Sequence, residues 1–243
     1  SEVPPKEALG SRLTLWVNEA RIHLLAATTV QLGRAKTCDI VTRIIRPDGT
    51  TPEELNRLIS RYHCHFKVQN NQCELVDRGW DPEAHRFKPS SYGTFVNGQR
   101  IIQGESHKGV DDIPFVVSLA RGGPVNPDIV SFDARLCTAA KALSSPLADK
   151  CRNKYNGDDL SCLVLQRRGI VPEVFVMLWK LWLPGTIIPR LSGTCICRSH
   201  DAFLIRTAEH CEWLVPGRKI NLMNAEIRVE EYNQNGIRKK NGD

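Results

Sequence analysis

Residues 59–66, ISRYHCHF, put a serine, an arginine and two histidines at the start of a segment that otherwise has the pattern of a β-strand. His63 and His65 alternate along that segment, so their side chains point to the same face. Such a cluster is typical of a metal or catalytic site, or of a surface that holds a bound anion. Catalysis would need a carboxylate partner for the histidines, and no Asp or Glu lies within the cluster.

The segments around this stretch are short, rich in Leu, Val and Thr, and partly alternating, which is typical of consecutive β-strands. The sequence NNQ at 70–72 predicts a hairpin turn, and Asn97-Gly98 predicts a tight turn with positive φ at both residues. An all-β fold class follows. The predicted strands of the first half lie within residues 12–18, 20–26, 28–34, 63–69, 73–77, 94–102, 115–120 and 128–137.

One helical insertion is expected near residues 51–58. Thr51 is suited to the N-cap, Pro52 to the first helical position, and Glu54 completes a capping box three residues after the cap. The loop from Thr42 to Leu58 that carries this helix is an insertion on the surface of the β domain.

The composition shift along the chain predicts two domains. Residues 139–159 are polar and broken by Ser-Ser-Pro and Asn-Gly, which indicates a linker. Residues 160–232 contain six further strand patterns, typical of a second, smaller β-sandwich. The segments FVNGQRI and LVPGRKI share a short similarity, which would make the second domain a degenerate copy of the first domain. Residues 1–10 and 233–243 are expected to be flexible ends.

The overall composition limits the functions to consider. The 243 residues are 41% hydrophobic, enough for real cores, and carry a net charge of +6 that suits acidic or phosphorylated partners. The nine cysteines lack a disulfide framework, no secretory or membrane-spanning pattern is found, and a cytoplasmic protein is expected. Only Cys195 and Cys197 are close together, so neither a metal nor a cofactor is expected. The chain has no aromatic and basic strip for nucleic acid.

Three polar clusters are predicted at the ends of strands, where loops gather at one edge of a sandwich. They are residues 33–34, 60–63 and 90–94. Binding groups usually lie on such loops. Arginine guanidinium groups and serine hydroxyls that meet there would match the oxygens of a doubly charged phosphate.

Three ordered motifs carry a resemblance to a known family. Gly33-Arg34, then Ser60-Arg61-x-His63, then Ser91-x-Gly93-Thr94-x-x-Asn97-Gly98 resemble the signature of the forkhead-associated (FHA) domain over about residues 11–138. The resemblance implies an FHA-like β-sandwich whose apical loops bind phosphothreonine in a partner protein. Transferred residue by residue, it implies a phosphopeptide-binding set of Arg34, Ser60, Arg61, Ser91, Tyr92, Thr94 and Asn97. It also implies structural support from Gly33, His63, Gly93 and Gly98.

Position 92 departs from the family pattern. The family usually has an asparagine there, which bonds to the ligand backbone, whereas this chain has Tyr92. A phenol cannot offer both an amide donor and a carbonyl acceptor. The departure therefore predicts a changed affinity or sequence preference.

The leading hypothesis is a non-enzymatic, phosphothreonine-dependent adaptor or signalling scaffold whose partner is a threonine-phosphorylated protein. The alternative is an FHA fold that acts as a phosphate-independent scaffold and binds through a sandwich face or edge. No Gly-x-Ser-x-Gly, P-loop or His-Glu-x-x-His motif indicates an enzyme. The second domain has no Gly-Arg followed by Ser-x-x-His, so it is not expected to bind phosphate.

Overall fold

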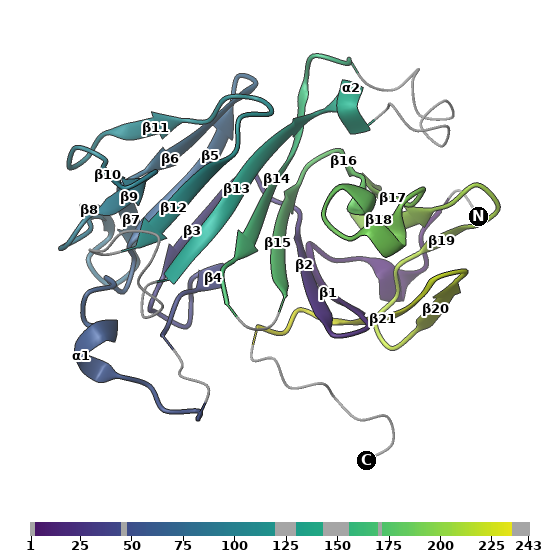
Figure 1. Cartoon of the computed structure of the whole chain (residues 1–243), viewed down its shortest axis with the longest axis horizontal. Coiled ribbons are helices and arrows are strands. Elements are labelled where there is room, and N and C mark those ends of the chain that lie inside the picture. The colour runs from purple at the N-terminus through teal and green to yellow at the C-terminus, as the bar shows by residue number, and fades with distance from the viewer. Residues whose placement is uncertain (1–2, 45–47, 120–129, 143–155, 170–171, 235–243) are drawn as a thin grey trace. The chain divides into compact units, whose positions relative to one another are not determined.

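The computed structural model describes residues 3–44, 48–119, 130–142, 156–169 and 172–234, and strands dominate it (Figure 1). The all-β fold class expected from the sequence is confirmed. Contacts divide the described residues into two compact units. The motif unit is drawn from residues 27–138 and 163–170, and the terminal unit from 1–26, 139–162 and 171–243.

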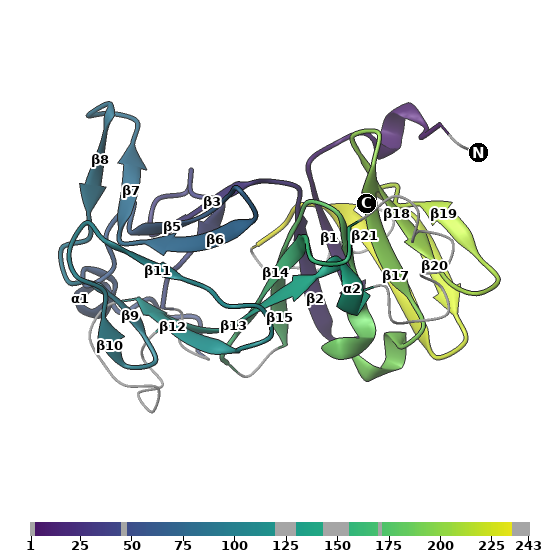
Figure 2. The same ribbon diagram turned by 90° about the horizontal axis from the view of Figure 1, so that it is seen from above.

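The motif unit is built from two sheets that lie in two layers (Figure 2). One sheet has the order β10-β9-β12-β13, formed by Gln99–Arg100, Thr94–Val96, Phe115–Leu119 and Val130–Thr138, and it continues into residues 163–167 of β14 (Leu160–Arg167). The other has the order β11-β6-β5-β3-β4, formed by Ser106–Lys108, Gln72–Val76, Cys64–Gln69, Thr29–Gly33 and Ile40–Val41. Leu32, Phe66, Val117 and Phe132 are buried, so apolar side chains of both sheets form the core.

Two predicted hairpin turns are confirmed. Asn70 and Asn71, which join β5 to β6, have φ values of 52° and 56°. Asn97 and Gly98, which join β9 to β10, have φ values of 50° and 81°. Paired residues in the left-handed region match the twist of the flanking strands, which is why these sequences form tight hairpins.

A separate hairpin, β7 (Arg78–Asp81) and β8 (Arg86–Pro89), forms its own two-stranded sheet. Figure 2 shows it projecting from the motif unit, and β7 is held against β3 and β5 by the side chains of Gln31 and His65. The sequence analysis did not predict this hairpin, nor the short strands β4, β11 and β20.

The predicted helix forms as α1 (Glu53–Asn56), but its predicted capping box does not. Pro52 is the N-cap residue with ψ 103°, and no side chain caps the helix. Thr51 therefore falls one residue outside the position from which its hydroxyl could cap the first turn. Asn56 fixes the insertion instead, because its amide accepts the N–H of Ile44 at 2.7 Å and donates to the Ile44 carbonyl at 3.1 Å.

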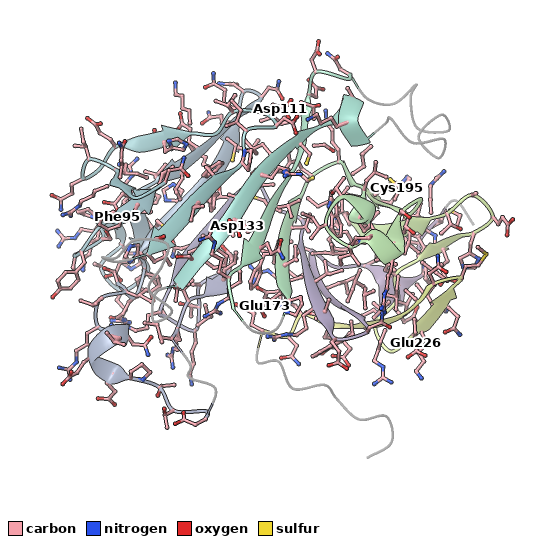
Figure 3. All side chains as sticks on the ribbon, in the orientation of Figure 1. Phe95, Asp111, Asp133, Glu173, Cys195 and Glu226 are labelled. Atoms are coloured by element: carbon pink, nitrogen blue, oxygen red, sulfur yellow. The ribbon has the colours of Figure 1, made fainter. Side chains whose placement is uncertain are left out.

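The terminal unit also contains two sheets. One has the order β15-β2-β1-β21-β20, formed by Glu173–Leu178, Ala20–Leu25, Arg12–Val17, Ala225–Glu231 and Lys219–Leu222. The other has the order β16-β17-β18-β19, formed by Leu181–Trp182, Cys195–Ser199, Ala202–Arg206 and Cys211–Trp213. Its short helical turns are Lys6–Ala8, α2 (Ala139–Ala142), Pro184–Thr186 and Pro189–Leu191. Glu173, labelled in Figure 3, lies on β15 and pairs with buried His23 at 3.0 Å.

The division by contacts differs from the sequence-based boundaries at the start of the chain. Strands β1 and β2 were assigned to the first domain, yet β1 pairs with β21 near the end of the described chain. Residues 3–10 differ from the expected flexible lead-in, since Ala8 is buried beside Trp213 and Leu9 bridges to Ala202. Strand partners this distant in sequence leave no local signal.

Parts of the expected linker and tail, residues 143–155 and 235–243, lie outside the described residues. In the part of the chain that is described, no helix is both long and apolar enough to cross a membrane.

Candidate functional site: three loops at one end of the motif unit

The three sequence motifs meet through main-chain and serine hydrogen bonds. The N–H of Arg34 donates to the carbonyl of Ser60 at 3.1 Å, which joins the first motif to the second. The N–H of Ser91 donates to the hydroxyl oxygen of Ser60 at 3.0 Å, which joins the second to the third. Residues 33–34, 60–63 and 91–94, separated in sequence, thus form one structural site, which we call the apical site.

Gly33 allows the first two loops to approach each other. A Cβ at this position would overlap the carbonyl oxygen of Arg61 and lie 3.0 Å from Sγ of Cys38. That carbonyl accepts the N–H of Ala35 at 2.9 Å. Any side chain at position 33 would push the Arg61 loop away.

His63 joins the second loop to the third from inside the unit. Its ring is buried; Nδ1 accepts the N–H of Ser60 at 3.0 Å, and Nε2 lies 2.8 Å from the carbonyl of Gly93. Because Nδ1 accepts an N–H, the proton must be on Nε2, which donates to Gly93. Burial lowers the pKa of His63 to about 4, so the ring is neutral at pH 7.

Asp77, which the sequence analysis did not single out, organises the third loop. Its buried carboxylate accepts hydrogen bonds from the hydroxyls of Ser90 at 2.6 Å and Thr94 at 2.7 Å. The Ser90 hydroxyl oxygen in turn accepts the N–H of Gly93 at 2.9 Å. Burial raises the pKa of Asp77. The available signal for this role was an aspartate as the last residue of a predicted strand, residues 73–77.

Thr94 was expected to contact the phosphopeptide, and the structure corrects this. The side chain is fully buried and its hydroxyl donates to Asp77. A group in the core cannot touch a ligand on the surface. Thr94 therefore supports the loop from below.

Asn97 and Gly98 form the exposed turn after β9. The side-chain oxygen of Asn97 accepts the N–H of Val116 at 2.8 Å, and its own N–H donates to the Val116 carbonyl at 2.9 Å. Both bonds tie the turn to β12, so the Asn97 side-chain oxygen is already committed within the fold.

Gly93 and Arg100 are in close contact beside the third loop. Gly93 has φ +98°, a conformation that favours glycine, and a Cβ there would lie 3.1 Å from Cζ of Arg100. Arg100 also lowers the pKa of Asp77 through its charge, against the larger effect of burial. Sequence reasoning missed Arg100, although it lies only two residues after Gly98, on β10.

Arg34, Ser60 and Ser91 keep hydrogen-bond donors available at the apical site. Nε of half-buried Arg34 donates to the carbonyl of Ile59 at 3.1 Å, which orients the guanidinium. Among the described residues, the terminal nitrogens of Arg34 and the hydroxyl hydrogens of Ser60 and Ser91 have no hydrogen-bond acceptor. A guanidinium with two hydroxyls matches an anion with several oxygens.

Arg61 and Tyr92 lie on the outside of the site. The Arg61 guanidinium forms two hydrogen bonds with the carboxylate of Glu83, at 3.0 and 3.4 Å, and it lies over the Tyr62 ring. The pair raises the pKa of Arg61 and lowers that of Glu83. The side chain of Tyr92 is 49% exposed.

The described residues contain no group of three or more His, Cys, Asp or Glu side chains that could hold a metal ion. No disulfide is formed among the cysteines of the described residues.

Comparison with known proteins identifies the class. The sequence model of the FHA domain family matches residues 30–109, which contain all three motifs. The chain therefore carries an FHA domain. A similar solved structure is the FHA-1 domain of Mycobacterium tuberculosis Rv1747, with 18% identity and a TM-score of 0.26, covering 46% of this chain and 89% of that one. Among curated proteins, none matches the sequence. FHA domains in general are protein-interaction modules that bind phosphorylated partners.

Proposed function

We propose that this protein binds a threonine-phosphorylated partner through the apical site and acts as an adaptor without enzymatic activity. The observation that carries the proposal is the meeting of Arg34, Ser60 and Ser91 from three separate loops. Each brings a donor group to one small area, and together they match a phosphate better than a singly charged carboxylate.

The loops are held before any ligand arrives, and this supports tight binding. His63 joins the Ser60 and Gly93 loops, and Asp77 holds the third loop through two hydroxyl donors. A binding surface that is already ordered loses less conformational entropy when the ligand binds. The buried hydrogen-bond network thus serves affinity as well as stability.

The test is calorimetric titration with phosphothreonine peptides, their phosphoserine counterparts and the unphosphorylated peptides. Arg34→Ala and Ser60→Ala should each weaken phosphothreonine binding tenfold or more, because a hydrogen bond to a charged group contributes roughly 1.5 to 3 kcal/mol. Lys108→Ala removes one positive charge from exposed β11 and serves as the matched control, with binding almost unchanged.

Two results would count against the proposal. Equal affinity for phosphorylated and unphosphorylated peptides would favour the phosphate-independent scaffold. Unaltered phosphopeptide affinity in both the Arg34 and Ser60 variants would show that the phosphopeptide binds outside the apical loops.

A further inference from the structure

The hairpin β7–β8 presents two exposed aromatic side chains on one face. Trp80 and Phe87 are cross-strand partners, and their ring centroids lie 5.2 Å apart with an interplanar angle of 69°. They remain 40% and 47% exposed on a hairpin that projects from the motif unit (Figure 2). Large aromatic side chains left at a surface are enriched where proteins contact each other.

The backbone under these two rings is held in place. The side-chain amide of Gln31 donates to the carbonyl of Trp80 at 3.0 Å and accepts its N–H at 2.7 Å. Nδ1 of His65 donates to the carbonyl of Arg78 at 2.6 Å. Gly79 packs so closely on Tyr62 that a Cβ would overlap the Tyr62 backbone. The rings therefore need little ordering when a ligand binds.

The aromatic face carries one positive charge. Strand alternation puts Arg78, Trp80 and Phe87 on the same face, and Cζ of Arg78 lies 5.1 Å from the Phe87 ring centroid. Asp81 lies on the opposite face and pairs with Lys88 at 2.9 Å. In the described part of the chain the indole N–H of Trp80 has no acceptor. The face thus offers two rings, a guanidinium and a spare donor.

The hairpin that carries this face is joined to the loops of the apical site. Strand β8 ends at Pro89, two residues before Ser91, and Glu83 in the hairpin turn pairs with Arg61. A depression of about 310 Å³ also borders Arg78, and it is lined by charges of both signs, including Lys67 and Glu74.

We propose that the face formed by Arg78, Trp80 and Phe87 is a second contact surface for the phosphorylated partner. It binds a segment of that partner, separate from the phosphothreonine, in which an apolar or aromatic side chain stands next to a carboxylate. The apolar side chain packs on the two rings, and the carboxylate pairs with Arg78. This inference rests on the proposed function, because the attachment of the hairpin to the apical loops, through Glu83 and Arg61, is what assigns the occupant.

The experiment compares long phosphothreonine peptides with two kinds of flanking arms, one of Gly and Ser, the other containing apolar–acidic pairs at varied distances from the phosphothreonine. The wild-type protein should bind the best apolar–acidic peptide about tenfold more tightly than the Gly/Ser peptide, as expected for a small cluster of anchor residues. The double variant Trp80→Ala, Phe87→Ala should lose that difference and keep its affinity for the Gly/Ser peptide. Arg86→Ala, on the opposite face of the hairpin, is the control and should behave as wild type.

The outcomes separate this inference from the proposed function. If the Gly/Ser phosphopeptide binds but the arms make no difference, or the double variant keeps the difference, the second surface is overturned and the proposed function stands. If no phosphopeptide binds the wild-type protein, the proposed function fails and this inference with it. The double substitution removes the cross-strand ring contact of the hairpin, so Trp80→Phe provides a milder change. An unchanged preference in both variants overturns the inference. Competition by single-stranded nucleic acid that depends on Trp80 and Phe87 would overturn the choice of a protein segment.

Discussion

Nε2 of His63 lies 2.8 Å from the carbonyl oxygen of Gly93, while Nδ1 of the same ring accepts the N–H of Ser60. One buried imidazole thus connects two of the three loops that form the apical site. Both hydrogen bonds require the neutral ring with its proton on Nε2.

The stability of the protein should depend on pH through His63. Its folded-state pKa is lowered to about 4 from an ordinary value of 6.5, so the unfolded chain takes up a proton first. The stabilisation is therefore fully present above about pH 6.5 and is lost as the pH falls toward about 4, up to about 3 kcal/mol in total. Urea unfolding at about pH 7 and about pH 5 measures this difference.

The matched variant is His63→Ala. This variant should have a lower melting temperature than the wild-type protein at neutral pH. It should also lose less stability on acidification. Part of the acid-dependent loss remains in the variant, because burial also lowers the pKa of His23. A melting temperature equal to that of wild type would contradict the role of His63 as the connection between the loops.

Thr94→Val should destabilise the fold without a direct effect on ligand contacts. The change removes the hydroxyl that donates to Asp77 at 2.7 Å and leaves a buried carboxylate with one fewer donor. A cost of about 1 to 3 kcal/mol in the free energy of unfolding is expected. Thr94→Ser keeps the hydroxyl and should be milder. If Thr94→Val abolished phosphopeptide binding at a temperature where the variant is fully folded, the buried role would be wrong.

Glu83→Gln should strengthen phosphopeptide binding. The Glu83 carboxylate holds the Arg61 guanidinium through two hydrogen bonds, and it competes with any anion that Arg61 would bind. Removing the charge of Glu83 should tighten phosphopeptide binding by about threefold at low salt. The gain should be smaller at high salt, because salt screens exposed ion pairs.

Glu54→Gln, an exposed change of the same kind on α1, is the control for Glu83→Gln and should leave the affinity unaltered. Weaker binding by Glu83→Gln would mean that the carboxylate orients Arg61 for the ligand.

Tyr92→Asn should tighten binding to phosphothreonine peptides while phosphate remains necessary. The exposed tyrosine stands where related domains have an asparagine that bonds the ligand backbone, and a neutral hydrogen bond contributes about 1 kcal/mol, or about fivefold in affinity. Calorimetry with one phosphopeptide compares the wild-type protein with Tyr92→Asn and with Tyr92→Phe, which keeps the ring. Loss of affinity in Tyr92→Asn alone would show that the ring packs on the bound peptide.

The local elements were predictable where the sequence pattern is itself the cause of the structure. Asn97-Gly98 forms its turn because both residues tolerate positive φ. The three motifs also identified the loops of the apical site in advance.

Other features follow from contacts between distant residues. Thr94 and Ser91 are both small hydroxyl residues in the third motif, yet one is fully buried against Asp77 and the other is exposed. The partner of each hydroxyl, and not its type, decides which one supports the loop from inside and which one faces solvent. Strand β1 joins β21 for a similar reason, since its partner lies more than two hundred residues along the chain.

The sequence alone determined the all-β class, the FHA family and the loops that form the apical site, because turn residues, strand alternation and motif spacing act locally. Only the tertiary structure decided which motif residues face solvent, that Asp77 and Arg100 belong to the support of the site, and that the unpredicted hairpin presents Trp80 and Phe87. The physical reason is that the burial and the hydrogen-bond partners of a residue depend on other residues that the fold brings close in space. Short-range sequence patterns do not predict those contacts.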